Sequence, residues 1–270
     1  MSTKIKQIYK EFALSLSNRH HFFPISKISS FNGIDSDTFM SLWDYDEEVI
    51  SFVKENKTLS GYRGLLYMPD EFIFDVDGSN LDQAKSLALA LIDLLDIPLQ
   101  TYFSGEKGFH IHISSTAFKW EPCADLNLKV KHTLNKKGIY EYADPLVIDK
   151  VRLIRVPNTK KLSSGYWKVP VKISEINDIN TEWLHKFAIK PRDRFDYEEL
   201  ETDPIFDVRK SLPKNKVTTK QHGTGPLNNE YVCIQRLMES APYGFRHKAA
   251  LTLGSPLRQR YPESAVRAFM

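Results

Sequence analysis

The chain contains only two cysteines, Cys123 and Cys233, among its 270 residues. Two cysteines are too few for a disulfide framework or for a zinc site built from cysteine alone, so we expect two reduced, structural thiols. Neither is predicted to be a nucleophile. Cys123 with His112 and His132 is the one mixed zinc site that the composition leaves open, and we predict that no zinc is bound.

Long apolar runs are also missing from the sequence. No segment approaches the roughly 18 to 20 apolar residues that a membrane-spanning helix needs. The first residues, Met1-Ser-Thr-Lys-Ile-Lys6, lack the apolar core of a secretory signal. These absences predict a cytoplasmic protein that has no membrane partner.

The excess of positive charge is small, because 37 Lys and Arg against 34 Asp and Glu give a formal net charge of +3. Such a balance does not by itself indicate nucleic-acid binding. The basic residues are nevertheless concentrated between Lys129 and Lys168, where ten of them stand against three acidic residues. This segment predicts either a solvated, lysine-rich face or, beside an acidic strand, a phosphate-binding surface.

Two carboxylates end a short apolar strand in the segment Phe72-Ile-Phe-Asp75-Val-Asp77-Gly78. In an extended strand, side chains two residues apart point to the same side at a spacing of about 7 Å. Asp75 and Asp77 can therefore share one or two hard cations, which metal-assisted phosphoryl chemistry requires. Alone, an Asp-x-Asp pair is weak evidence, because such pairs also occur at solvent-facing turns.

A helix is predicted directly after this strand. Apolar residues recur at helical spacing from Leu81 to Leu95, behind a cap at Ser79 or Asn80. The strand and the helix together form a strand-turn-helix unit, which places the two carboxylates at the turn.

A hairpin is predicted next, from the extended segment 99–103 and the strictly alternating segment 109–113. The alternation is typical of a strand with one polar face. The turn between the two strands reads Ser104-Gly-Glu-Lys-Gly-Phe-His110. Its small residues let backbone amides face an anion, while Lys107 and His110 can donate to phosphate oxygens. The same pattern also fits a plain glycine hairpin with a core histidine.

Residues 139–142, ending at Asp144, and residues 151–155 are predicted to form two further strands. Residues 1–60 mix helix-like segments with loops and are expected to flank the core. Because strands and helices are interleaved, we predict an α+β fold with a central mixed or antiparallel sheet flanked by helices.

The sequence predicts three regions along the chain. Residues 1–190 hold the main domain, and residues 191–229 are polar and aperiodic, as in a linker. A helical pattern resumes at 230–270, which we expect to be the start of a small helical accessory domain in a longer protein.

Three motifs in this order resemble the archaeo-eukaryotic primase superfamily, in particular its plasmid and phage primase-polymerases. They are Asp75-Val-Asp77, the turn from Ser104 to His110, and Asp144 with the segment after it, Val151-Arg-Leu-Ile-Arg-Val-Pro-Asn-Thr-Lys-Lys161. The resemblance covers roughly residues 65–175. It implies a primase-type core and a DNA primase or primase-polymerase, which is a template-dependent nucleotidyltransferase that makes primers or extends DNA on a single-stranded template.

The resemblance also implies the site residues. The metal ligands would be Asp75, Asp77 and Asp144, holding two Mg²⁺ or Mn²⁺ ions. The nucleotide ligands would be Ser104, Lys107, His110, Arg152, Arg155 and Lys161, with His110 also counted among the catalytic residues. The implied partners are single-stranded DNA, nucleoside triphosphates, and a helicase or another replication protein.

Two details of this assignment stay open in the sequence. Asp149 is a second candidate for the third metal ligand, although the eight-residue interval to Arg152 favours Asp144. Arg152 and Arg155 lie three residues apart, so both cannot face inward along an ideal strand, and a turn or bulge is expected there.

Two other functions use the same residues. A metal-dependent nuclease or hydrolase could be built on Asp75 and Asp77 with His110 and His112, an His-x-His pair on one strand face. A non-catalytic replication-initiator module that binds single strands could stack bases on aromatic side chains: Tyr102, Tyr166 and Trp167. The intact acidic residues favour the polymerase, while priming versus extension and ribo- versus deoxynucleotide preference stay open.

Overall fold

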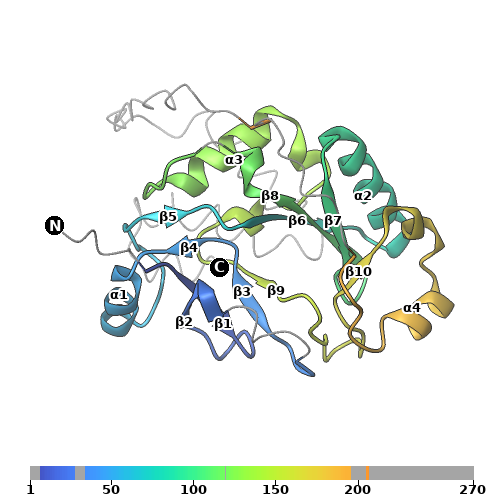
Figure 1. Cartoon of the computed structure of the whole chain (residues 1–270), viewed down its shortest axis with the longest axis horizontal. Coiled ribbons are helices and arrows are strands. Elements are labelled where there is room, and N and C mark those ends of the chain that lie inside the picture. Colours follow the sequence, from blue (N-terminus) through green and yellow to red (C-terminus); the bar gives the residue numbers. More distant parts are fainter. Residues whose placement is uncertain (1–6, 28–33, 119, 196–204, 207–270) are drawn as a thin grey trace, which may run out of the picture. The chain divides into compact units, whose positions relative to one another are not determined.

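The structure is a computed structural model and describes residues 7–27, 34–118, 120–195 and 205–206 (Figure 1). The chain divides into two units, residues 1–214 and 215–270, and every described residue belongs to the first. The predicted accessory domain at 230–270 and most of the predicted linker at 191–229 lie outside the described residues. Within the described part, the fold is α+β, as the sequence predicts.

A four-stranded antiparallel sheet carries Asp75 and Asp77 (Figure 1). Its strand order is β10-β7-β8-β6, with β6 at Glu71–Asp77, β7 at Leu99–Phe103, β8 at Gly108–Ser114 and β10 at Val169–Val171. Strands β6, β7 and β8 confirm the predicted strand and hairpin. The short edge strand β10 pairs with β7 and is an addition to the prediction.

Alternation along the strands divides this smaller sheet into two faces. Cross-strand partners share a face, and the register pairs Phe74 with Ile111 and Val76 with Phe109 on one side. On the other side it pairs Asp75 with His110, confirming the polar face predicted for β8. Both faces are nevertheless buried along β8, because His110 is only 5% exposed.

Helix α2 spans Leu81–Leu95 and packs against β6 and β8. Its N-cap is Asn80, whose side chain accepts a hydrogen bond from the Gln83 amide at 2.9 Å. The helix ends at Asp96, which adopts a left-handed conformation. The predicted strand-turn-helix unit is therefore confirmed, and it holds the end of β6 against a rigid element.

The second sheet has six strands in the order β5-β4-β1-β3-β9, with β2 also paired to β1. The strands are β1 (Tyr9–Ala13), β2 (His21–Pro24), β3 (Phe39–Ser41), β4 (Asp44–Tyr45), β5 (Leu66–Tyr67) and β9 (Leu153–Arg155). The predicted single central sheet is thus two sheets, and every strand pair within them is antiparallel.

The prediction of helix-like segments and loops for residues 1–60 was only partly right, because it missed the strands. In the described part of this region there are four strands and one helix, α1 at Glu48–Asn56. Strand β1 is buried along its whole length, so its sequence shows no alternation of apolar and polar residues. Short buried strands of this kind cannot be distinguished from helix segments by periodicity.

The predicted strand at 139–142 was wrong. Helix α3 (Leu126–Lys136) ends just before Gly138, whose φ of 73° turns the chain into a single 3-10 turn at Ile139–Glu141. The predicted strand at 151–155 is shortened to β9, because the Arg152 amide bonds to the Asp149 carbonyl at 2.9 Å in a turn. The turn ends at Arg152 and β9 follows directly, so the expected turn lies before Arg152 and not between Arg152 and Arg155.

The last described helix is α4 at Thr181–Phe187, and residues of the predicted linker pack beside it. Arg192 bonds both carboxylate oxygens of Glu175, at 2.7 and 3.0 Å. Phe206 is buried and stacks on Phe118 with a ring separation of 4.7 Å. The described parts of the segment after residue 190 are therefore attached to the core.

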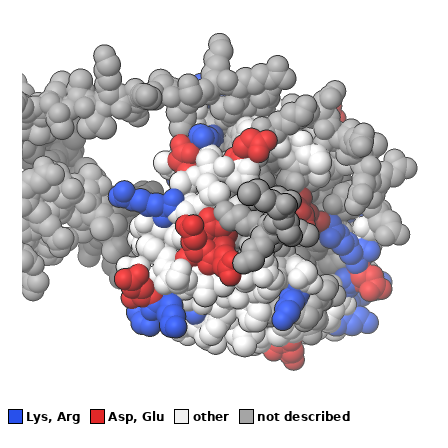
Figure 2. Space-filling model, turned by 60° about the vertical axis from the view of Figure 1, so that its left-hand side comes forward, with Lys and Arg blue, Asp and Glu red and all other residues white. Residues whose placement is uncertain are grey.

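Charges of both signs are interspersed on the face of the molecule shown in Figure 2. This distribution agrees with the small formal net charge of +3. Among the described helices, none combines the length and the apolar character that crossing a membrane demands.

Candidate active site

Asp75 and Asp77 lie at the end of β6, opposite residues of the predicted phosphate-binding turn. The register pairs Asp75 with His110 and Asp77 with Gly108. The His110 Nε2 lies 3.5 Å from Asp75 Oδ1. The predicted Asp-x-Asp motif and the predicted turn are thus brought together by strand pairing alone.

Asp144 reaches the same place from a different segment. Its backbone amide donates a hydrogen bond to the carbonyl of Asp75 at 2.8 Å. Its side chain caps the 3-10 helix Pro145–Ile148 by accepting from the Leu146 amide at 2.8 Å. Asp149, the alternative candidate, lies 3.4 Å from Lys131 of α3. The structure therefore places Asp144 beside Asp75 and pairs Asp149 with a lysine.

The pKa values of Asp75 and Asp77 are both raised in this environment. Burial, followed by the charges of Asp77 and Asp144, raises the pKa of Asp75 to about 7, although Lys168 and Lys161 oppose the shift. The pKa of Asp77 is also raised by burial and by Asp144, against the opposing charges of Lys107 and Lys161. Carboxylates that repel one another at partial burial form a donor set that fits a divalent cation.

The three carboxylates do not form a closed metal site in this structure. Among the residues that the structure describes, no three His, Cys, Asp or Glu side chains converge closely enough to hold a metal ion. Carboxylate oxygens at the end of a strand have the chemistry for Mg²⁺ or Mn²⁺, and the mutual repulsion at Asp75 is what a bound cation would relieve.

The turn from Ser104 to Gly108 is shaped by its two glycines. Gly105 has a φ of +103°, which side-chain-bearing residues rarely adopt. A Cβ at Gly108 would lie 2.4 Å from Asp77 Oδ1 and 2.9 Å from the Val76 carbonyl. The turn therefore approaches the end of β6 so closely that only glycine fits, which keeps Ser104 and Lys107 next to the carboxylates.

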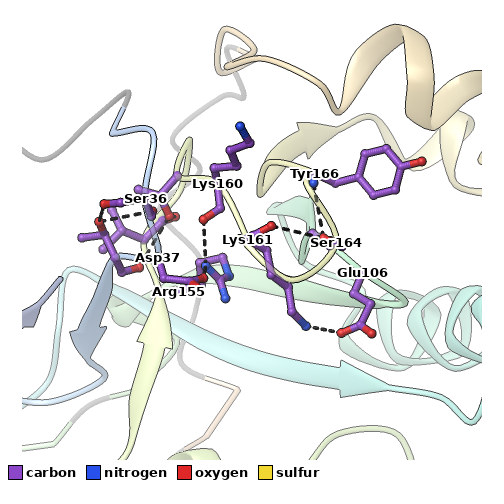
Figure 3. Close-up of polar contacts among 12 residues, drawn as sticks. Ser36, Asp37, Glu106, Arg155, Lys160, Lys161, Ser164 and Tyr166 are labelled. Atoms are coloured by element: carbon purple, nitrogen blue, oxygen red, sulfur yellow. Dashed lines mark hydrogen bonds and ion pairs between the residues drawn. The ribbon is translucent and has the colours of Figure 1, made fainter. Parts of the chain in front are cut away.

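Lys161 and Arg155 lie at the same end of the sheet, and each is already paired with a carboxylate (Figure 3). Lys161 bonds Glu106 of the turn, and Arg155 bonds Asp37. The Arg155 Nη1 also donates to the Lys160 carbonyl at 3.2 Å. Lys161 influences the pKa of both Asp75 and Asp77, which places it close to the carboxylates.

Arg152 is the predicted ligand that the structure does not bring into this group. It is exposed in the turn before β9. Within the described part of the chain, its side chain forms no hydrogen bond or ion pair with another predicted site residue.

His110 is buried among these groups. Burial, together with the charges of Lys168 and His112, holds the pKa of His110 well below its usual range, so its imidazole is neutral. Among the described residues, its Nδ1 has no hydrogen-bond partner. The neutral ring therefore directs Nε2 toward Asp75 and keeps Nδ1 unused, and a ring nitrogen in this state can bond to a ligand.

A buried polar chain behind His110 was missed by the sequence analysis. Lys168 is fully buried and donates to the Arg155 carbonyl at 2.8 Å and to His112 Nε2 at 3.2 Å. His112 Nδ1 in turn lies 2.8 Å from Glu71 Oε2. The alternation of β8 indicated that His112 belongs to a polar strand face. No sequence pattern indicated that Lys168 is buried, because it stands among lysines that are typical of a surface.

Side chains from the larger sheet and from the loops between its strands donate hydrogen bonds to the segment that follows Asp144. The Trp43 indole donates to the Ile148 carbonyl at 2.8 Å, and the Tyr45 hydroxyl donates to the Lys150 carbonyl at 2.6 Å. Arg19 donates to the Val151 carbonyl at 2.8 Å. Residues that had no assigned chemistry therefore fix the backbone that carries the third carboxylate.

Comparisons with known proteins give few matches. No family model matches the sequence, and no curated protein matches it. Among solved structures, the chain is similar to the polymerase domain of Mycobacterium tuberculosis ligase D in complex with DNA. The TM-score is 0.35 at 16% identity, over 66% of this chain and 68% of that chain. Similarity at this level carries no argument about activity.

Proposed function

We propose that the protein is a template-dependent nucleotidyltransferase of the primase-polymerase type, which joins nucleoside triphosphates on single-stranded DNA. One observation carries the proposal: Asp75, Asp77 and Asp144 are neighbours at one end of the smaller sheet, beside the turn that holds Lys107 and the segment that holds Lys161. Nucleotidyl transfer needs this combination, because carboxylates hold divalent ions and fixed cations hold the phosphates.

Asp75, Asp77 and Asp144 would hold the Mg²⁺ or Mn²⁺ ions. When bound, such ions activate the attacking 3′-hydroxyl and neutralise charge on the pyrophosphate leaving group. The Leu146 amide donates to only one oxygen of the Asp144 carboxylate, so this carboxylate can cap the short 3-10 helix and still offer its second oxygen to an ion.

The phosphates of the incoming nucleotide would lie against the turn and the basic segment. The residues with this role are Ser104, Lys107, His110, Arg155 and Lys161. Arg155 is held in place by Asp37 and by its stacking over Phe39, with 4.8 Å between its Cζ and the ring centre. Arg152 stays a predicted ligand whose exposed side chain would reach the phosphates from the turn before β9.

The hydrolase alternative is disfavoured by the state of His112. Its Nδ1 contacts Glu71 and its Nε2 contacts Lys168, so neither ring nitrogen is available to a metal ion. The His-x-His pair on which that alternative depended is therefore reduced to His110.

The non-catalytic alternative is disfavoured by the energetics of the carboxylates. Burial, followed by the charges of Asp77 and Asp144, raises the pKa of Asp75 to about 7, so ionised Asp75 opposes folding at neutral pH unless a cation joins it. A module that only binds single strands gains nothing from this arrangement.

The test is a product assay with labelled ribo- and deoxynucleoside triphosphates, Mg²⁺ or Mn²⁺, and single-stranded DNA with or without a primer. We expect synthesis to fall at least about 1000-fold in the Asp75→Asn/Asp77→Asn variant, because the metal ligands are lost. The matched control is Asp93→Asn/Asp178→Asn, which removes two exposed carboxylates elsewhere.

The products distinguish the possible activities. Synthesis on unprimed DNA identifies a primase, and extension of a primer alone identifies a polymerase. Degradation of the template would replace the proposal by the nuclease, and undiminished synthesis in the Asp75/Asp77 variant would reject the assigned site.

A further inference from the structure

Half of the basic residues in segment 129–168 are paired with carboxylates. Five of its ten basic residues form ion pairs: Lys129 with Asp125, Lys131 with Asp149, Arg155 with Asp37, Lys160 with Asp35, and Lys161 with Glu106. Two of these pairs, those of Arg155 and Lys161, lie where the proposed function needs cations for phosphates. A ligand that binds there exchanges its own anionic groups for the carboxylates already present.

The Arg155 and Lys161 pairs differ in burial. The Arg155 side chain is 9% exposed and that of Asp37 is 26% exposed, whereas those of Lys161 and Glu106 are 26% and 51% exposed. A buried guanidinium pair holds its geometry, because separating the partners leaves a charge without solvent. An exposed lysine pair is weak and exchanges readily, since its net contribution to stability is about 0–1 kcal/mol. Glu106 is therefore the carboxylate that a phosphate can displace.

Glu106 bonds directly to Lys161, which is one of the predicted nucleotide ligands. Its pKa is lowered by the hydrogen bond and charge of Lys161, and further by the charges of Lys107 and Arg155, which are also predicted nucleotide ligands. The Glu106 carboxylate therefore occupies on Lys161 the place of an anionic group of the ligand.

The two turns that carry this pair are also joined by a contact that does not involve it, because the Ser164 hydroxyl donates to the Gly105 carbonyl. Within its own turn, the Lys161 amide donates to the Tyr166 carbonyl at 2.7 Å. A Cβ at Gly105 would lie 3.2 Å from the Lys161 Cβ. Because these contacts persist without the Glu106 side chain, the turns can stay in place while Lys161 changes partner.

We propose that Glu106 is an internal competitor of the nucleotide, which sets the affinity of the site for polyphosphates by occupying Lys161 in the ligand-free protein. The inference rests on the proposed function for the identity of the natural ligand. Binding then includes one exchange, in which Lys161 leaves the Glu106 carboxylate for a phosphate oxygen and Glu106 turns to solvent.

The experiment measures equilibrium binding of ATP, dATP and inorganic tripolyphosphate by calorimetry, without template so that no turnover occurs. Glu106→Gln should tighten the binding of triphosphates about fivefold, which corresponds to removal of one exposed ion pair. Glu55→Gln, an exposed site on α1, is the matched control and should change nothing. Weakened or unchanged binding in Glu106→Gln overturns the proposal, because a positioning residue would lose affinity.

A second variant distinguishes the exchange of the Lys161–Glu106 ion pair from a long-range effect of the Glu106 charge on the ligand. In a Lys161→Met background, Glu106→Gln should tighten binding less than twofold, because the displaced pair no longer exists. A gain that remains fivefold in this background also overturns the proposal. If wild type binds tripolyphosphate but neither nucleotide, the proposed function fails while the role of Glu106 can still be decided with tripolyphosphate.

Discussion

The two sheets contribute to the site in different ways. One presents side chains, and the other holds the backbone of a connecting segment by hydrogen bonds. The smaller sheet presents side chains, since Asp75, Asp77 and His110 project from paired positions of β6 and β8. The larger sheet contributes no predicted ligand except Arg155, at the end of its edge strand β9. Instead, its polar side chains bind backbone carbonyls of residues 148, 150 and 151.

This difference follows from how each sheet can fix a functional group. Neighbouring strands fix side chains directly, because cross-strand partners are about 5 Å apart. A carboxylate on a connecting segment has no such partner, so its backbone must be held by hydrogen bonds from elsewhere. A buried bond of this kind contributes about 1 kcal/mol, and three of them act on one short segment.

Gly108→Ala tests the smaller sheet and has the largest expected effect. The added methyl group would meet Asp77 Oδ1 at 2.4 Å and the Val76 carbonyl at 2.9 Å, so the carboxylate has to move. We expect nucleotide incorporation to fall at least about 100-fold, as misplaced catalytic groups typically do. Stability should fall by about 1–3 kcal/mol through overpacking.

Initial rates and urea unfolding of the same preparations measure both effects. The control is Gly61→Ala, where φ is +84° and nothing lies within 4 Å, so strain arises without a clash. Equal losses of activity in the two variants would show that backbone strain, and not the contact with Asp77, is responsible.

The buried polar chain runs from His112 of the smaller sheet through Lys168 to the Arg155 carbonyl of the larger sheet. The pH dependence of stability tests this chain. Burial, with the neighbouring Lys168, lowers the pKa of His112 from 6.5 to about 4. The unfolded chain therefore takes up a proton between pH 6.5 and 4 that the folded protein refuses, and the free energy of unfolding falls as the pH falls through this range. The contribution of His112 to this fall is about 3 kcal/mol.

His112→Asn should flatten this profile, because the titrating group is gone. Urea unfolding at several pH values between 7 and 4 gives the slopes, and His185→Asn, which removes an exposed histidine of α4, should leave them unchanged. A slope in His112→Asn as steep as in wild type would mean that His112 is protonated in the fold.

Tyr45→Phe tests the hydrogen bonds between the larger sheet and the segment after Asp144, and it has the smallest expected effect. It removes the hydroxyl that donates to the Lys150 carbonyl at 2.6 Å. We expect a loss of about 1 kcal/mol in the free energy of unfolding. A reduction of kcat should accompany it, because the segment after Asp144 loosens.

Thermal unfolding and steady-state rates provide the measurement. Tyr9→Phe is the control, since this tyrosine lies on the same sheet and its hydroxyl, among the residues that the structure describes, bonds to Gln7 alone. A change in stability with no change in kcat would confine the role of Tyr45 to folding.

Elements with their own periodicity could be predicted from the sequence. The alternation of β8, the apolar spacing of α2 and the turn residues between β7 and β8 are local properties of the chain, and the structure confirms these elements. Strand β1 could not be predicted, because it is buried throughout, and neither could the 3-10 turn at 139–141, because short segments follow their surroundings.

The chemistry of the site was determined by the sequence, since residue types and their order along the chain indicate carboxylates, a glycine turn and phosphate-binding cations. The tertiary structure alone decided which of them meet. It placed Asp144 beside Asp75, paired Lys161 with Glu106, and buried Lys168 against His112. These contacts join residues far apart in sequence, so they depend on packing between the sheets, for which the sequence contains no local signal.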